Sequence, residues 1–144
     1  MNSATRGRAA ALAPAEEWRA GALRNLGSAR ALAARGRDWV TVYYLTGFSV
    51  ELMLKAVRVR RDRLPAWPAS DIGYRWHDLE SVAQRSRILP MIWAEGAARP
   101  ALGANWLTVS AWDPKKRYPP YTLSEADARG ILWAAADPAD GVMA

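Results

Sequence analysis

Two charged residues stand four positions apart in an otherwise apolar stretch. Glu51 and Lys55 lie among the valine, leucine and methionine side chains between Val50 and Val59. Residues four apart share one face of a helix, so this carboxylate and ammonium can pair. An exposed pair would add only about 0.3–0.5 kcal/mol. The apolar neighbours favour partial burial, and a buried carboxylate must be paired or protonated. We therefore expect either a structural buried pair or one wall of a ligand site.

His77 is the single histidine of the chain, and it lies beside Trp76 and Asp78 at the expected start of a helix. An imidazole titrates near neutrality and can act as a general acid or base. The alternative is a structural role in capping and packing at the helix start. The residue types alone favour the structural role.

A third group of candidate residues follows Pro114. Lys115, Lys116 and Arg117 are consecutive cations, and Tyr118 and Tyr121 lie next to them. Guanidinium and ammonium groups can hold a phosphate, while a tyrosine ring can stack on a base. A solvated loop that Tyr118 anchors to the core explains the same pattern equally well.

Composition excludes several classes of site. The 144 residues contain no cysteine and one histidine, which excludes disulfides, thiol catalysis, iron–sulfur clusters and a multi-histidine metal site within one protomer. No Gly-x-Ser-x-Gly elbow is present. We expect no metal and no cofactor. The net charge is +6, and arginine supplies most of the 20 basic residues. This charge fits either an anionic partner or the base composition of the genome.

The elements that must position these residues are helices. The apolar pattern and the helix start and stop signals predict helices over residues 14–36, 38–61, from about 77, 91–98, 101–109 and 124–137. Asp38 can cap the second helix, which is apolar nearly all round and so belongs at the centre of a bundle. Ser124 and Asp127 form a capping box for the last. Three prolines in residues 112–121 argue against a helix there. No segment alternates as a strand does, so we expect an all-α antiparallel bundle of four to six helices.

The chain is long enough for one domain. We expect a flexible tail over residues 1–13, a single helical domain over 14–137 and a C-terminal tail over 138–144. No apolar run reaches the length that spans a bilayer, and no signal peptide is evident, so the sequence predicts a cytoplasmic protein with no membrane contact. Eight tryptophans exceed what one small core buries, which favours a homodimer.

Three segments together resemble the HEPN family of small helical-bundle domains. The first runs from Tyr43 to Ala56, with an aromatic start, Glu51 and a Leu-Lys-Ala ending. The second is His77-Asp78-Leu79, and the third is Arg117-Tyr118-Pro119. The resemblance covers residues 39–133. It implies a homodimer, which in many family members acts with a nucleotidyltransferase partner in a toxin–antitoxin or defence system.

The resemblance also separates two branches of that family. Its ribonuclease branch carries an arginine, four to six residues and then a histidine in a late helix. Here the matching positions before His77 are Ser70, Asp71 and Ile72, and only Trp76 separates Arg75 from His77. The chain therefore resembles the branch without the ribonuclease motif, for which binding of a nucleotide, RNA or a partner protein is expected.

These expectations define one candidate site. We expect Glu51, Lys55, His77 and Arg117 to converge on one cleft, in which Lys55 and Arg117 neutralise phosphate and Glu51 orients Arg117 or His77. The remaining ligand-binding candidates are Arg75, Asp78, Lys115, Lys116 and Tyr118.

Two alternatives to this binding role remain open. In one, the chain is a divergent metal-independent ribonuclease toxin, in which His77 is the general base, Arg75 or Arg117 holds the phosphate, and two protomers pool their residues. In the other, the chain is a structural interaction module, and the polar residues only fix loops around the bundle.

Overall fold

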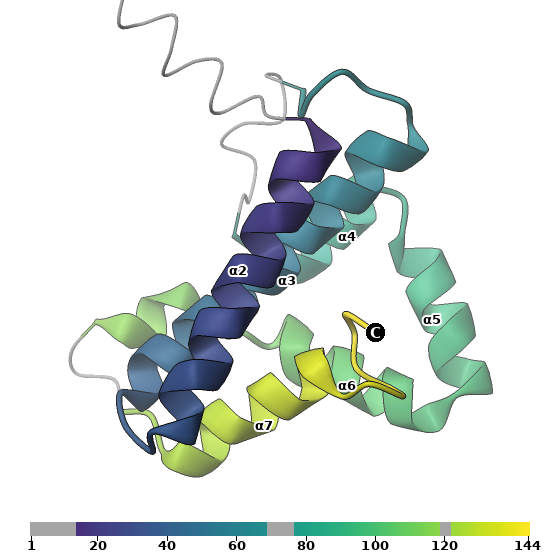
Figure 1. The fold of residues 1–144 in the computed structure, drawn as a ribbon. Helices are drawn as coiled ribbons and strands as arrows, with labels where there is room; N and C mark the ends of the chain where they lie inside the picture. The colour runs from purple at the N-terminus through teal and green to yellow at the C-terminus, as the bar shows by residue number, and fades with distance from the viewer. Residues whose placement is uncertain (1–13, 69–76, 119–121) are drawn as a thin grey trace, which may run out of the picture.

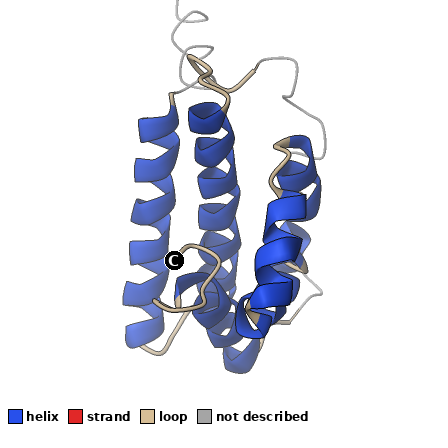
Figure 2. Ribbon diagram, turned by 90° about the vertical axis from the view of Figure 1, so that its right-hand side faces the viewer, coloured by secondary structure: helices blue, strands red, loops and turns tan. Residues whose placement is uncertain are grey.

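The structure is a computed structural model that describes residues 14–68, 77–118 and 122–144. Every regular element in the described residues is a helix, as Figures 1 and 2 show, and this confirms the predicted all-α bundle. The elements are α2 (Ala15–Ala34), α3 (Trp39–Arg61), α4 (Leu79–Arg85), α5 (Leu89–Ala98), α6 (Pro100–Ser110), the 3₁₀ helix η2 (Pro114–Arg117) and α7 (Glu125–Ala136).

Helix α3 is the centre of the fold, as its apolar pattern predicts. It pairs along its length with α2 and also packs against α4, α7 and η2. Val42, Val50 and Val59 are almost fully buried along it. A short connection joins α2 and α3 into an antiparallel hairpin (Figure 1), in which Gly36 takes the left-handed conformation at the end of α2. Asp38 occupies the cap position of α3, but its carboxylate accepts a hydrogen bond from the Thr41 hydroxyl instead of a backbone N–H.

Prolines begin the later helices. Pro90 and Pro100 stand in the first turns of α5 and α6, where the missing N–H costs nothing. These helices therefore start earlier than the expected residues 91 and 101. They form a tight hairpin, because a Cβ on Gly96 would lie 2.9 Å from the Cα of Gly103. In Figure 1 α5 stands apart from α2.

The segment predicted to lack helix contains one turn of it. Pro114 opens η2, and the Asp113 carboxylate caps this turn by accepting a hydrogen bond from the backbone N–H of Lys115 at 2.9 Å. Proline breaks a helix from within but is tolerated at its first position, which explains the difference.

The C-terminal residues, predicted as a tail, fold back onto the bundle. The N–H groups of Val142 and Met143 donate to the carbonyls of Ala134 and Ala135 at 3.0 and 2.9 Å, and both side chains pack against the core. Gly141 makes this return possible, since a Cβ there would lie 2.5 Å from the carbonyl oxygen of Asp137. The predicted N-terminal tail, residues 1–13, lies outside the described residues.

The length and composition of α3 differ from the expectation that no apolar run could span a bilayer. By length and composition α3 is apolar enough to cross a bilayer, and 61% of its most apolar stretch is buried within the fold. Core helices of bundles meet the same criterion, so this property does not assign a location to the chain.

Candidate functional site

Glu51 joins two of the candidate residues in one network. On α3 its carboxylate Oε2 accepts a hydrogen bond from Lys55 Nζ at 2.9 Å, and its Oε1 lies 2.7 Å from Nδ1 of His77. The side chains of Glu51 and Lys55 are fully buried, whereas that of His77 is 54% exposed. The predicted buried pair is therefore present, and it extends to the surface through the imidazole.

Tryptophan rings cover the ammonium of Lys55. Nζ lies 5.6 Å from the ring centroids of both Trp18 on α2 and Trp67 in the loop after α3. Burial lowers the pKa of Lys55 to about 8, and the charge of Glu51 opposes this shift. Because its side chain has no exposed surface, Lys55 cannot meet a phosphate, contrary to the expected role. Its contacts instead fix the position of Glu51.

His77 is held in a defined orientation. With Nδ1 directed at the Glu51 carboxylate, Nε2 lies on the other side of the ring. Nε2 accepts a hydrogen bond in the neutral ring that is protonated on Nδ1, and it donates one in the imidazolium. The following residue, Asp78, caps α4 by accepting a hydrogen bond from the N–H of Ser81 at 3.1 Å. This cap fixes the backbone next to the imidazole. Asp78 thus has a structural function in addition to any ligand contact.

A surface pocket of about 520 Å³ lies in front of this histidine. Its volume falls within the range of small-molecule sites, about 300–1,000 Å³. It brings together three predicted residues, His77, Asp78 and Lys115, from segments nearly forty residues apart. The described lining residues are His77, Asp78, Ser110, Trp112, Asp113, Pro114 and Lys115.

The other two cations of η2 point toward tyrosines of α3. Lys116 Nζ lies 5.7 Å from the centroid of the Tyr43 ring. The Arg117 guanidinium lies 4.6 Å from the Tyr44 ring and 4.8 Å from the Tyr118 ring, and it donates a hydrogen bond to the Tyr118 hydroxyl at 2.8 Å. Tyr118 is 55% exposed. Cation and rings therefore form an exposed, layered surface.

Arg117 does not join Glu51 as predicted. Tyr44, on which Arg117 lies, precedes Glu51 by seven residues, which is about 10.5 Å along a helix axis. Among the described residues Glu51 orients His77, and the tyrosines hold Arg117. Arg75 lies outside the described residues.

Two contacts that the sequence did not reveal position η2. The N–H of Asp113 donates to the Tyr43 hydroxyl at 2.9 Å, which fastens the start of the turn to α3. The Trp112 ring packs directly on Gly47, where a Cβ would lie 2.1 Å from the ring. A glycine inside an apolar helix was the one available signal of such a close approach.

Comparisons of the chain with family models, with curated proteins and with solved structures give no significant match. The function is therefore inferred from the geometry of the site.

Proposed function

We propose that this chain is a HEPN-like domain that binds the phosphate of RNA or of a nucleotide in the pocket between His77 and Lys115. One observation carries the proposal: an imidazole oriented by the buried carboxylate of Glu51 lines the same pocket as the exposed Lys115. When the His77 ring carries both protons, its Nε2–H donates a hydrogen bond, and the Lys115 ammonium donates as well, so both groups suit the acceptor oxygens of a phosphate.

The neighbouring residues suit the rest of a nucleotide. Arg117 and Tyr118 form the exposed cation–ring surface next to η2. Aromatic and guanidinium planes stack on bases with little sequence preference, at about 1–3 kcal/mol per base. The overall charge of +6 favours approach of a polyanion. Asp78 and Asp113 line the same pocket, and each accepts a hydrogen bond from a backbone N–H, which satisfies one of its carboxylate oxygens.

The proposal includes assembly into a homodimer and pairing with a nucleotidyltransferase-type protein in a two-component system, as the HEPN resemblance implies. It also includes the cytoplasmic location that the sequence predicts. Trp93 and Trp133 support association, since 59% and 64% of these residues are exposed. Large exposed aromatic residues are enriched at protein interfaces.

The direct test is equilibrium binding. Fluorescein-labelled single-stranded RNA and a labelled nucleotide would be titrated with wild type, Lys115→Ala, His77→Ala and the control Arg60→Ala, which removes an exposed cation from the far end of α3. We expect both site variants to weaken binding at least fivefold, and Lys115→Ala to reduce the salt slope by about 0.7–1. Equal affinity of all four proteins would contradict the proposal.

Cleavage of RNA is the second candidate function, and the Glu51–His77 contact favours it. A carboxylate that fixes an imidazole orients it as a general base, which could take the proton of a ribose 2′-hydroxyl. Incubation of labelled RNA with the protein in EDTA separates the two functions. Cleavage that His77→Ala abolishes would establish the ribonuclease, whereas binding without cleavage supports the leading proposal.

A further inference from the structure

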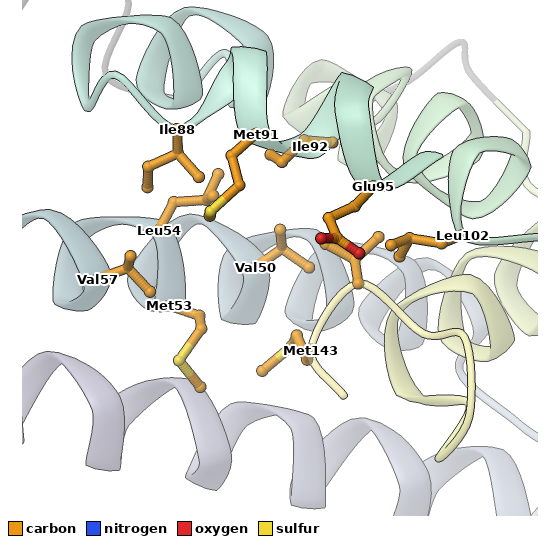
Figure 3. A pocket seen from close by; sticks show the side chains of 11 residues that line it. Val50, Met53, Leu54, Val57, Ile88, Met91, Ile92, Glu95, Leu102 and Met143 are labelled. Carbon is orange, nitrogen blue, oxygen red and sulfur yellow. The ribbon is translucent and has the colours of Figure 1, made fainter. Parts of the chain in front are cut away.

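A second pocket lies on a different face of α3, between α3, α5 and the C-terminal residues (Figure 3). Its volume is about 200 Å³, somewhat larger than the roughly 150 Å³ cavity that suffices for a benzene molecule. It opens to solvent, because Met91 and Val57 are 57% and 36% exposed. It therefore has room for one or two large apolar side chains that enter from outside.

Two helices present matching stripes to this pocket. Its lining includes Val50, Met53, Leu54 and Val57 from α3, and Ile88, Met91, Ile92 and Glu95 from the start and length of α5. Both sets have the spacing i, i+3, i+4 and i+7, which is the spacing of the seam through which helices pack on one another. In Figure 3 Met91 and Ile92 of α5 face Val50 and Leu54 of α3, whereas the Met53 side chain extends toward α2.

The inner positions of each stripe are already part of the core, since Val50, Leu54 and Ile88 are buried. The outer positions remain open, and they include Met53, Val57 and Met91. The seam therefore has two helices and space along it for the apolar ridge of a third. Methionine suits such a surface, because its flexible side chain adapts to different partners.

Charge specifies the third helix further. Glu95 is the one charged residue among the described residues that line the pocket, although the chain as a whole carries +6. It is exposed, and in Figure 3 its carboxylate points from α5 into the end of the pocket, near Leu102. An occupant must therefore bring apolar side chains along the seam and a cation at the Glu95 end.

We propose that this groove binds an amphipathic α-helix of a partner protein, with apolar anchors at i, i+3, i+4 and i+7 and a lysine or arginine that pairs with Glu95. A second copy of this chain is a poorer occupant, because a two-fold interface centred on the groove would set one concave surface against another. A separate helix supplies the convex ridge that the groove requires.

The test uses a fluorescein-labelled synthetic helix of 18 residues, with leucines at the anchor spacing, a lysine at one end of that face, and alanine and glutamine elsewhere. We expect micromolar binding to the full chain. A peptide of the same composition in scrambled order should bind at least tenfold more weakly. The same should hold for a peptide with glutamate in place of the lysine.

Protein variants locate the binding. Met91→Lys should weaken binding at least tenfold, whereas the control Leu107→Lys, at a 70% exposed leucine of α6 outside the groove, should change it less than twofold. Glu95→Lys should reverse the preference and favour the glutamate peptide, which provides a second readout if Met91→Lys fails to fold. Equal binding by Met91→Lys and Leu107→Lys, or no reversal with Glu95→Lys, would overturn the proposal. A wild-type dimer that Met91→Lys dissociates would overturn it as well, because a second copy would then fill the groove.

Discussion

Nδ1 of the half-exposed His77 lies 2.7 Å from Oε1 of the fully buried Glu51, whose other oxygen is bonded to Lys55. The carboxylate thus has a cation inside the protein and an imidazole at its surface. The sequence analysis places Lys55 and His77 together in one ligand-binding cleft, but the structure gives them different positions, one buried and one exposed. Lys55 stabilises the arrangement from within, and His77 presents it to a ligand.

The first prediction concerns the buried pair. Glu51→Gln removes the carboxylate next to a buried ammonium, and breaking such a pair costs about 3–5 kcal/mol. The double variant Glu51→Gln/Lys55→Met should recover at least about 1 kcal/mol relative to the sum of the single variants, because it removes both charges. Urea denaturation of the four proteins gives the coupling free energy directly.

A surface pair of the same spacing provides the control. Arg129 Nε lies 2.8 Å from Glu125 Oε1, but both side chains are about half exposed. Glu125→Gln should therefore change the free energy of unfolding by less than about 1 kcal/mol. Additive effects at Glu51 and Lys55 would show that the buried pair has no special contribution.

The second prediction concerns pH. The pKa of Lys55 falls from 10.5 to about 8 in the folded chain, so between these values the unfolded chain binds more protons than the folded one. Stability must then rise with pH across this interval. Relative to Lys55→Met, the wild type should gain up to about 3 kcal/mol between pH 8 and 10.5, at about 1.36 kcal/mol per unit. Denaturation at several pH values measures the difference, in which the shared tyrosines and other lysines cancel. A difference that does not vary with pH would show that the ammonium stays charged.

The parts of the fold that were predictable depend on local pattern. The apolar surroundings of Glu51 and Lys55 lie within one helix, and helical periodicity predicts both their pairing and their burial. The tryptophans that cover Lys55 could not be found in this way. Trp18 lies on another helix and Trp67 in a loop, and only the tertiary packing of α2 on α3 brings their rings to 6.4 Å. Such contacts between distant segments carry no periodic signal.

The three cations of η2 illustrate a second limit of prediction from the sequence. Three consecutive cations give no indication of which one faces a site, because the answer depends on the type of turn. In a 3₁₀ helix successive side chains point about 120° apart. Lys115 consequently lines the pocket with His77, while Lys116 and Arg117 turn to Tyr43 and Tyr44. Of the three cations that the sequence names as candidates, only Lys115 lines this pocket.

The third prediction tests the cap of α7. The Ser124 hydroxyl accepts a hydrogen bond from the Asp127 N–H at 3.0 Å, and the Asp127 carboxylate accepts one from the Ser124 N–H at 3.3 Å. Ser124→Ala removes the first of these and should destabilise the fold by about 1 kcal/mol. Thr122→Ala, two residues earlier and outside the cap, should have no measurable effect. Thermal denaturation compares the two, and equal melting temperatures would mean that the box contributes nothing.

The fourth prediction tests how η2 is positioned. At Gly47 the added methyl group of alanine would overlap the ring of the buried Trp112, which lies two residues before the first residue of η2. Overpacking of this kind typically costs about 1–3 kcal/mol and exceeds the gain of up to about 1 kcal/mol that alanine brings inside a helix. Gly47→Ala should therefore destabilise the fold and change the near-ultraviolet circular dichroism of Trp112. Because Trp112 also lines the pocket of His77, ligand binding should weaken at the same time.

Gly27 in α2 is the matched control for Gly47. It is also a glycine inside a helix, but a Cβ there would meet no atom within 4 Å. Gly27→Ala should raise the free energy of unfolding by up to about 1 kcal/mol, since only the helix propensity changes. Opposite signs for the two substitutions in urea denaturation would confirm that the Trp112 ring requires a glycine in α3. The same stabilisation in both variants would show that the ring moves aside without cost, and that the position of η2 does not depend on this contact.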